Sequence, residues 1–298
     1  MADLLSTGRA PRARLRALLS AGPPLVAPGA YDALSARLVE QAGFDVVYMT
    51  GFGTTAALIG RPDVGLLSGA EMVENARRIV SAVDVPVIAD ADTGYGNALN
   101  VVRTVQLYEQ AGVAGIQLED QVMPKKCGHM SGKALVGTDE MVGKIRAAVA
   151  ARTDPDLVII ARTDAVAVSG LDEALSRARA FAEAGADLLF VEAPTSEDDI
   201  ARVAKELSGV APLVFNWAEG GRTPPLSLDR IAELGFSLVI YPIGTLLAAT
   251  AGIRSLLATL KAEGTPAAAL GGLPSFEEFT DLIGLPEVQE LEQRFSGT

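Results

Sequence analysis

The sequence almost lacks cysteine, histidine and tryptophan, with one of each in 298 residues. A single cysteine cannot form an internal disulfide, and a structural zinc site takes four ligands that are mainly Cys or His. Disulfides are typical of secreted proteins, whereas isolated thiols are typical of intracellular ones. The sequence therefore predicts an intracellular protein, which we expect in the cytoplasm.

Basic residues are also scarce. The chain has 25 Lys and Arg against 37 Asp and Glu, which gives a net charge of −12. Binding to nucleic acid needs clustered Lys and Arg, so we expect no nucleic acid partner and no anionic membrane surface. The longest apolar run, residues 237–253, is interrupted by Pro242 and Gly244. It is read as a strand followed by a buried helix and not as a membrane span.

The first residues lack the long apolar segment of a signal peptide. Four arginines, of which Arg9 is the first, lie between residues 9 and 16 and are compatible with a transit peptide. Leucines at positions 15, 18 and 19 favour the alternative, a surface helix with its apolar side facing inward.

Short apolar runs alternate with helical patterns along most of the chain. The runs are rich in Val and Ile, as in strands buried on both faces of a parallel sheet, and they occupy residues 25–28, 46–51, 85–92, 115–120, 157–164, 188–193, 212–216 and 238–243. Eight strands and eight helices at roughly 30 residues per unit predict an α/β fold, a (β/α)₈ TIM barrel over about residues 20–265. A helical extension over about residues 266–298 completes a single domain. An open doubly wound sheet is the alternative, but no Gly-rich dinucleotide motif follows the first strand.

Acidic residues stand where two neighbouring strands are expected to end. Asp90 and Asp92 close the third run and Glu119 closes the fourth. Residues two apart in a strand face the same side, so three carboxylates would meet at the active-site end of the barrel. A hard divalent cation, Mg²⁺ or possible Mn²⁺, would relieve their repulsion. Alternatively, these acids cap helices or pair with Lys or Arg.

Further polar groups point to the same end of the barrel. Arg162 follows the fifth run and offers a fork for a carboxylate or phosphate, or else a salt bridge to Glu119 or Glu192. Thr50 and Gly51 offer a hydroxyl and a backbone N–H to an anion, or form an ordinary turn. Gly-rich loops at residues 53–65, which include Asp63, and at residues 219–227 are expected to close over a ligand.

The cysteine and the histidine both lie in the pentapeptide KKCGH, residues 125–129. Cys127 has Lys125, Lys126 and His129 as neighbours, so we expect its pKa to be lowered. A Cys–His hydrolase usually takes these residues from distant parts of a chain. A general acid–base thiol on a mobile loop is therefore the preferred interpretation, and an inert buried cysteine is the alternative.

Together these motifs resemble the isocitrate lyase/phosphoenolpyruvate mutase superfamily. The chain is most similar to its short members, the 2-methylisocitrate lyases, 2,3-dimethylmalate lyases and carboxyphosphonoenolpyruvate mutases. The resemblance covers nearly all of residues 20–265 and is carried by PGAYDALSA, YMTGFG, DADTGYGN, LEDQVMPKKCGH, ARTDA, the Glu of FVEA, and NWAEGGRTP. Of these, KKCGH after LEDQ is highly specific.

The resemblance implies roles for individual residues. Asp90 and Asp92 would hold Mg²⁺, partly through waters, with Asp63 and Glu119 in support. The substrate would be bound by Thr50, Gly51, Phe52, Gly128, Arg162, Glu192 and Asn216. It also implies a homotetramer whose last helices swap between subunits, which would explain the aromatic residues of the extension.

The implied chemistry is a Mg²⁺-dependent carbon–carbon lyase reaction. A substituted 2-hydroxy dicarboxylate or tricarboxylate would be cleaved to a 2-oxoacid such as pyruvate and the enediolate of a carboxylic acid. Tyr48 would act on the hydroxyl proton, and Cys127 would protonate the carbanion, tuned by Lys125 and His129, with Glu119 among the catalytic acids. The alternatives are a carboxyphosphonoenolpyruvate-type phosphonomutase, an oxaloacetate hydrolase or decarboxylase, and a barrel without catalysis.

Two positions depart from the methylisocitrate lyase pattern. Leu247 stands where an arginine would bind a third carboxylate, and Trp217 directly follows Asn216. As a pocket wall, Trp217 would favour a less polar substrate, although core packing at a strand end is an equal alternative. The sequence therefore favours 2,3-dimethylmalate or a substituted malate over methylisocitrate.

Overall fold

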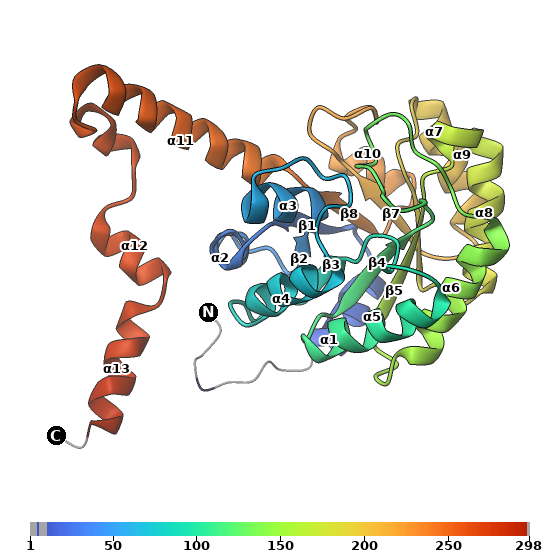
Figure 1. Ribbon diagram of the computed structural model, residues 1–298, viewed down its shortest axis with the longest axis horizontal. Helices are drawn as coiled ribbons and strands as arrows, with labels where there is room; N and C mark the ends of the chain where they lie inside the picture. The colour runs from blue at the N-terminus through green and yellow to red at the C-terminus, as the bar shows by residue number, and fades with distance from the viewer. Residues whose placement is uncertain (1–4, 6–10, 297–298) are drawn as a thin grey trace.

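The computed structural model describes residue 5 and residues 11–296. Within these residues, eight parallel strands form a closed barrel in chain order, and β8 pairs with β1 to complete it (Figure 1). The strands are β1 Leu25–Ala30, β2 Val47–Met49, β3 Val87–Asp90, β4 Gly115–Glu119, β5 Val158–Thr163, β6 Leu188–Val191, β7 Leu213–Asn216 and β8 Leu238–Tyr241. The predicted (β/α)₈ barrel is confirmed, and each strand lies within or beside the apolar run that predicted it.

Helices surround the barrel and follow the strands. They are α1 Pro11–Ser20, α2 Ala33–Gln41, α3 Gly51–Ile59, α4 Gly69–Val80, α5 Ala98–Gln110, α6 Thr138–Ala151, α7 Val166–Ser169, α8 Leu171–Glu183, α9 Glu197–Leu207, α10 Leu228–Glu233 and α11 Gly244–Glu263, then the 3₁₀ turn Ala267–Gly272, α12 Phe276–Leu282 and α13 Leu285–Phe295. Helix α3 corrects the prediction of a loop over residues 53–65, because the Thr50 hydroxyl caps a helix there by accepting from Gly53 N–H.

The apolar interior has two parts. One lies between the strands and the outer helices, and the other fills the barrel, where Ile88, Ile160 and Phe190 are buried. Leu15 of α1 belongs to the inner part and is fully buried, so α1 closes the N-terminal end of the barrel. The predicted surface helix is thus confirmed from residue 11 onward, while Arg9 lies outside the described residues.

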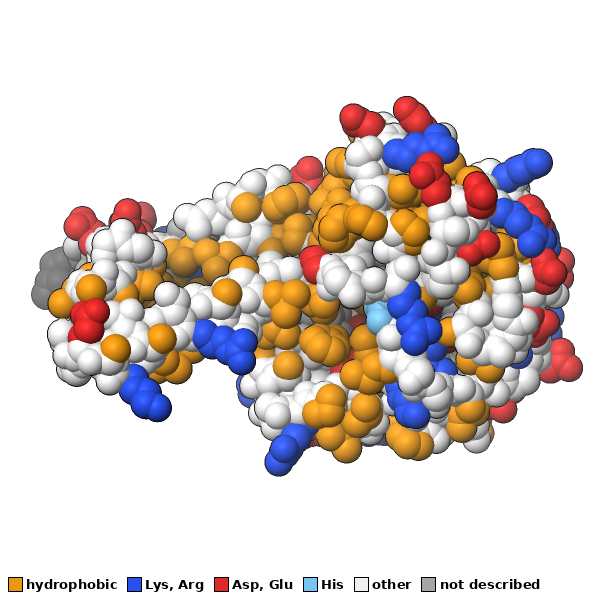
Figure 2. Space-filling model, turned by 90° about the horizontal axis from the view of Figure 1, so that it is seen from above, with side chains coloured by type: hydrophobic (Ala, Val, Ile, Leu, Met, Phe, Trp, Pro, Cys, Tyr) orange, Lys and Arg blue, Asp and Glu red, His pale blue; other side chains and the backbone are white. Residues whose placement is uncertain are grey.

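Helix α11 leaves the barrel and carries the last helices away from it (Figure 1). Its first turn is held by the Thr245 hydroxyl, which donates to Gly29 O at 2.7 Å, but none of its residues is buried. The expectation of a buried helix here was wrong, because beyond its first turn, which contacts β1, most apolar residues of α11 stay exposed in the described part of the chain. Figure 2 shows hydrophobic side chains along this projecting tail. None of the helices in the described ranges is long and apolar enough to cross a membrane.

Candidate active site

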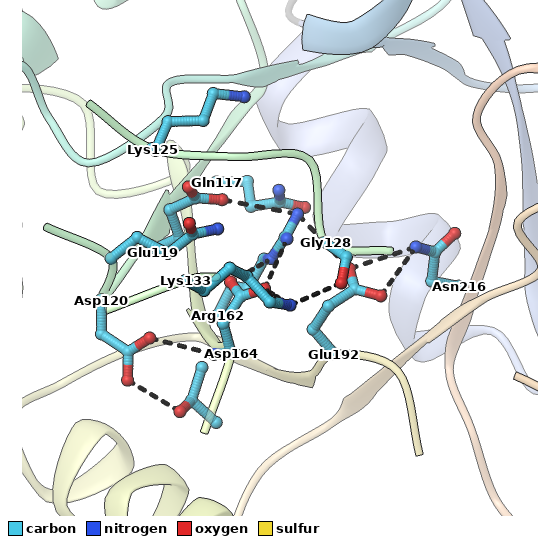
Figure 3. A network of polar contacts seen from close by, with 12 residues as sticks. Gln117, Glu119, Asp120, Lys125, Gly128, Lys133, Arg162, Asp164, Glu192 and Asn216 are labelled. Atoms are coloured by element: carbon cyan, nitrogen blue, oxygen red, sulfur yellow. Dashed lines mark hydrogen bonds and ion pairs between the residues drawn. The ribbon is translucent and has the colours of Figure 1, made fainter. Parts of the chain in front are cut away.

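A cavity of about 220 Å³ opens at the C-terminal ends of the strands. This is the end of a (β/α)₈ barrel at which active sites lie. Of the residues predicted from the sequence, those that line it are Tyr48, Thr50, Phe52, Asp63, Asp90, Lys125, Cys127, Gly128, His129, Arg162, Glu192 and Asn216. The structure therefore brings together residues from six different strand ends or loops, and Figure 3 shows part of this polar network.

The acidic residues are arranged around Lys125. Strand β3 ends at Asp90, and Asp92 has a φ of 47°, in the left-handed region. The alternation of a regular strand therefore does not extend to Asp92, which corrects the simple expectation that both side chains leave one strand face. The Lys125 Nζ atom lies 2.6 Å from Asp63 Oδ2 and 2.7 Å from Asp92 Oδ1. Burial alone would lower the pKa of Lys125, but Asp92, Glu119 and Asp63 together raise it well above its ordinary value.

The donor set of this cluster suits a hard divalent cation. Burial, together with the charge of Asp92, raises the pKa of Asp90 to about 6. Burial also raises the pKa of Glu119 well above its ordinary value, and its Oε1 atom has no hydrogen-bond partner among the described residues. A bound cation would stabilise the charged forms of the Asp90 and Glu119 carboxylates, which burial disfavours. Carboxylate oxygens are also the ligands that Mg²⁺ prefers. In the described part of the chain, no three acidic, His or Cys side chains converge into a ready ligand group, so the predicted metal set stays a prediction.

Gly51 allows Asp90 to approach the start of helix α3. A Cβ atom at Gly51 would lie 2.4 Å from Asp90 Oδ2, which is far closer than van der Waals contact. Gly51 and the Thr50 cap therefore place the N-terminus of α3, with its partial positive charge, beside the cavity. This geometry fits the predicted role of residues 50–52 in binding an anionic group.

Cys127 is held at the cavity by its backbone. Its N–H donates to Asp63 O at 3.1 Å. The expected lowering of its pKa is wrong: burial raises the pKa of the thiol, and the His129 backbone N–H and Arg162 only partly oppose this effect. The lysines do not help, because Lys125 pairs with Asp63 and Asp92 while Lys126 Nζ donates to Gly132 O at 2.8 Å. Cys127 is therefore a protonated thiol, suited to give a proton.

Alkylation tests this protonation state directly, because Cys127 is the sole thiol of the chain. The rate of its reaction with iodoacetamide is expected to reach half of its maximum above pH 8.5, the approximate pKa of a free thiol, since burial raises the pKa. Rates across pH 6–11 can be followed by mass spectrometry. The same chain unfolded in urea is the control, and a folded midpoint at or below the unfolded one would contradict the assignment.

The imidazole of His129 joins two loops. Its Nδ1 atom accepts from the Arg222 backbone N–H at 3.0 Å, so the proton of the neutral ring is on Nε2, which lies 3.4 Å from Glu192 Oε1. Burial lowers the pKa of His129, with Glu192 acting in the opposite sense. A Cβ atom at Gly221 would lie 2.7 Å from the ring. The predicted closure of residues 219–227 over the site thus has a defined contact with the KKCGH loop.

Arg162 lies at the centre of the polar network in Figure 3. Its Nε and Nη2 atoms each donate to Asp164 at 3.0 Å, while Nη1 lies 3.5 Å from Glu119 and 3.3 Å from Glu192. The salt-bridge alternative for Arg162 is therefore present, and Nη1 is the edge turned toward the acids of the cavity. Burial would lower the pKa of Arg162, but Asp164, Glu192 and Glu119 raise it well above its ordinary value.

Gly128 has no side chain, and this allows the KKCGH loop to pack closely against Arg162 and Glu192. A Cβ atom there would lie 2.5 Å from Arg162 Nη2 and 2.7 Å from the Glu192 carboxyl carbon. Gly128→Ala is expected to lower kcat/KM by about 100-fold, because displacement of a catalytic group by about 1 Å has an effect of this size. Gly143→Ala on α6 is the matched control, since nothing lies within 4 Å of its added carbon. Equal activity of the two variants would contradict the tight fit.

Tyr48 is buried within the barrel, and its hydroxyl donates to Gln117 Oε1 at 3.3 Å. Burial, with a contribution from Asp90, raises its pKa well above 10, whereas Arg162 and Lys125 act against this rise. The resting side chain is therefore a phenol. Its role in moving the hydroxyl proton stays a prediction.

Two residues used in the substrate prediction do not line the cavity. Trp217 stacks on Tyr241 with centroids 5.6 Å apart, and its Nε1 donates to Leu226 O at 2.9 Å. It packs against the core behind the strand end, as the core-packing alternative expects, and its role in substrate binding stays a prediction. Leu247 is 48% exposed on α11. Neither residue contacts the described cavity, and the preference drawn from them has no support in the structure.

Several residues of the site were missed by sequence reasoning. Lys133 Nζ lies 2.7 Å from Asp164 and also donates to Gly128 O, so it ties the KKCGH loop to the partner of Arg162. Asp120 accepts from the Thr163 hydroxyl and the Asp164 N–H. Glu219 lines the cavity and caps α11 through Ile243 and Gly244 N–H. Asp120 and Glu219 lie in the LEDQ and EGGRTP segments that carry the resemblance, but nothing there gave them a role, and Lys133 lies four residues after His129 in the same loop.

Comparison with known proteins finds relatives over nearly the whole chain. The family profile described as phosphoenolpyruvate phosphomutase matches residues 15–261. The chain is 50% identical over 284 residues to 2,3-dimethylmalate lyase of Eubacterium barkeri, covering 95% of this chain and 98% of that protein. It is 43% identical to 2-methylisocitrate lyase of Aeropyrum pernix, covering 95% and 90%.

Solved structures give the same result. A crystal structure of 2,3-dimethylmalate lyase has a TM-score of 0.90 and 41% identity, covering 98% of this chain and 97% of that one. Oxaloacetate acetylhydrolase bound to 3,3-difluorooxalacetate has a TM-score of 0.91 and 38% identity, covering 97% and 98%. Phosphonopyruvate hydrolase, in a complex with oxalate and Mg²⁺, has a TM-score of 0.88 and 36% identity, covering 96% and 99%. The chain therefore belongs to the isocitrate lyase/phosphoenolpyruvate mutase superfamily and is an enzyme related to its lyases.

Proposed function

We propose that this enzyme is a Mg²⁺-dependent lyase that cleaves 2,3-dimethylmalate or a closely similar 2-hydroxy diacid. The observation that carries the proposal is that Cys127, whose pKa burial raises, lines one cavity with buried carboxylates and Arg162. The similarity to the 2,3-dimethylmalate lyase of Eubacterium barkeri supports the substrate class. The cavity of about 220 Å³ suits a small-molecule carboxylate substrate.

Asp90 and Asp92 would hold Mg²⁺, with Asp63 and Glu119 in support. When bound there, Mg²⁺ supplies Lewis-acid polarisation of a hydroxyl and its neighbouring carboxylate. The substrate carboxylate next to the hydroxyl is placed by the N-terminus of α3, from Thr50 onward.

The chain's own residues carry the protons in this reaction. Tyr48 is proposed to receive the hydroxyl proton as a phenolate, after its own proton has left to solvent, and the proton it takes up returns through solvent to the Cys127 thiolate after the cleavage. Arg162 and Lys125 favour the phenolate because they oppose the effect of burial on the pKa of Tyr48. The bond between carbons 2 and 3 then breaks. Carbon 2 becomes the carbonyl of pyruvate, and carbon 3 keeps the electron pair as the enediolate of propionate. Arg162 Nη1 stabilises that negative charge, and the Cys127 thiol gives its proton to carbon 3.

Release of a 2-oxoacid tests this function. Purified enzyme with Mg²⁺ is expected to release pyruvate from 2,3-dimethylmalate, measured with a coupled dehydrogenase, and to release none with EDTA. The panel should include 2-methylisocitrate, isocitrate and oxaloacetate. Release from methylisocitrate instead would retain the lyase and reject the small diacid, while no product from any hydroxy acid would reject the lyase.

An oxaloacetate hydrolase is the second candidate. It is supported by the similarity to oxaloacetate acetylhydrolase, at 38% identity over 97% of this chain. Formation of oxalate and acetate from oxaloacetate, without pyruvate from dimethylmalate, would replace the first proposal with this one.

The projecting tail suggests how the chain assembles. Along α11 to α13, exposed apolar residues include Ile253, Leu257 and Phe276, which are 59%, 55% and 85% exposed. We infer that these helices pack against a second copy of the chain in a homotetramer, with the last helices exchanged between subunits. Burial of apolar area of this extent would favour association.

Replacing two of these residues tests the assembly. Ile253→Ser with Leu257→Ser is expected to shift the mass measured by light scattering from tetramer toward smaller species, since their apolar contacts would be lost. Leu99→Ser is the matched control, because Leu99 is 78% exposed on α5 of the barrel. A wild-type monomer, or equal masses for all three proteins, would contradict the inference.

A further inference from the structure

Lys125 uses the same carboxylates that the proposed cation would use. Its ammonium is 2% exposed and contacts Asp63 Oδ2 at 2.6 Å and Asp92 Oδ1 at 2.7 Å. Both carboxylates are themselves nearly buried, with side chains 6% and 5% exposed. Buried charges at such short range interact strongly, because little water separates them.

The other nearby cation is already matched by its own partner. Arg162 forms a fork with Asp164, with two bonds of 3.0 Å. Lys125 is therefore the cation in direct contact with Asp63 and Asp92, while Arg162 acts on Asp63 and Asp90 through its charge at longer range. A divalent cation that bound these acids would be repelled by Lys125 and would compete with it for the same oxygen atoms.

We propose that Lys125 is a competing internal cation that sets the affinity of the acidic cluster for Mg²⁺. This inference rests on the proposed function, because it concerns the same cation site. By lowering the affinity, Lys125 keeps the binding of the cation reversible. It also keeps the carboxylates together by satisfying their charge.

The same lysine links the cation to the catalytic thiol. Cys127 lies two residues after Lys125, and its backbone N–H donates to Asp63 O at 3.1 Å. The contacts of Lys125 and Cys127 therefore both fall on Asp63. When a cation binds the carboxylates, the Lys125 ammonium would move away from Asp63. Because Asp63 also holds the backbone of Cys127, this movement would shift the position of the thiol. Cation binding and the position of Cys127 are therefore coupled.

Direct binding of Mn²⁺ tests the competition without an activity assay. Free Mn²⁺ is followed by electron paramagnetic resonance, and Mg²⁺ is titrated by calorimetry. Lys125→Met is expected to bind either ion at least about tenfold more tightly than the wild type. That is the least effect of removing a unit charge about 6 Å from a divalent ion, even at the dielectric constant of water. Lys126→Met is the matched control, since its ammonium contacts Gly132 O and no carboxylate of the cluster.

The outcomes separate this inference from the proposed function. No binding to the wild type would reject the cation site itself. Binding to the wild type with equal or weaker binding to Lys125→Met would overturn the competition and leave the site in place. Lys125→Gln is a second neutral variant that keeps amide donors beside Asp63, the hydrogen-bond partner of Lys125, and it is expected to show the same tightening if Lys125→Met fails to fold. In the wild type alone, saturating Mg²⁺ is expected to change the alkylation rate of Cys127; no change would overturn the coupling.

Discussion

Cys127→Ser is expected to lower kcat by about 1,000-fold or more while the protein stays folded. A positioned general acid contributes roughly 10² to 10⁴ to a rate, and a serine hydroxyl is a far weaker acid than even a thiol whose pKa burial has raised. The two side chains have nearly the same shape. The backbone contacts of the loop, Cys127 N to Asp63 O and Met130 N to Cys127 O, do not involve the thiol. The loss would therefore report on proton transfer.

Isotope exchange gives a second readout for this variant. By microscopic reversibility, the Cys127 thiolate should remove a proton from carbon 2 of propionate when pyruvate is also bound. In deuterated water the wild type is then expected to exchange this proton, as seen by NMR, and Cys127→Ser is expected not to. Lys126→Met serves as the control in the same loop. Turnover or exchange above about a tenth of the wild-type rate in Cys127→Ser would contradict the assignment of the acid.

The barrel was predictable because the sequence pattern of its strands is easy to recognise. Parallel strands covered on both faces are apolar nearly throughout, so their ends are marked by the first charged residues. Asp90, Glu119 and Arg162 each stand at such an end. Since all C-terminal strand ends of a barrel face one side, residues far apart in sequence could be placed at one site before any coordinates were known.

The errors arose where the side chain's direction decides the outcome. Lys125 is two residues from Cys127 in sequence, but its ammonium turns to Asp63, 62 positions away, so the expected lowering of the thiol pKa does not occur. Trp217 follows a cavity residue but turns to Tyr241, as the core-packing alternative expects. Helix α11 has an apolar surface that fits a buried barrel helix, yet it is unburied in the single chain. Sequence patterns report which residues are apolar and not which chain covers them.

Arg162→Gln is expected to lower the free energy of unfolding by about 3–5 kcal/mol at neutral pH and to abolish activity. Removing one partner of a buried ion pair leaves an uncompensated charge, and such changes are among the most destabilising. Here Asp164 would lose two hydrogen bonds of 3.0 Å, and Glu119 and Glu192 would lose a neighbouring positive charge. Arg162→Lys keeps the charge but not the fork, so an intermediate loss is expected.

The pH dependence of this loss identifies its cause. Burial raises the pKa of Asp164, but Arg162 and Lys133 reverse this and hold it below the ordinary value. In the wild type, the ion pair between Arg162 and Asp164 therefore stabilises the folded state above about pH 4. This stabilisation is lost as the pH falls through the lowered pKa of Asp164. Without Arg162, the pKa of Asp164 moves upward, and protonation stabilises the folded variant at a higher pH.

The gap in stability between wild type and Arg162→Gln should consequently shrink as the pH is lowered from 7.5 to 5, measured by urea unfolding at each pH. Arg152→Gln is the control, because it breaks the pair of Arg152 with Asp187 at the opposite end of the barrel. It is expected to leave kcat/KM within about threefold of the wild type, since a distant and partly exposed pair touches none of the reacting groups. A gap that stays constant from pH 7.5 to 5 would show that the loss comes from packing, and a gap that widens toward pH 5 would likewise contradict the buried charge of Asp164 as its cause.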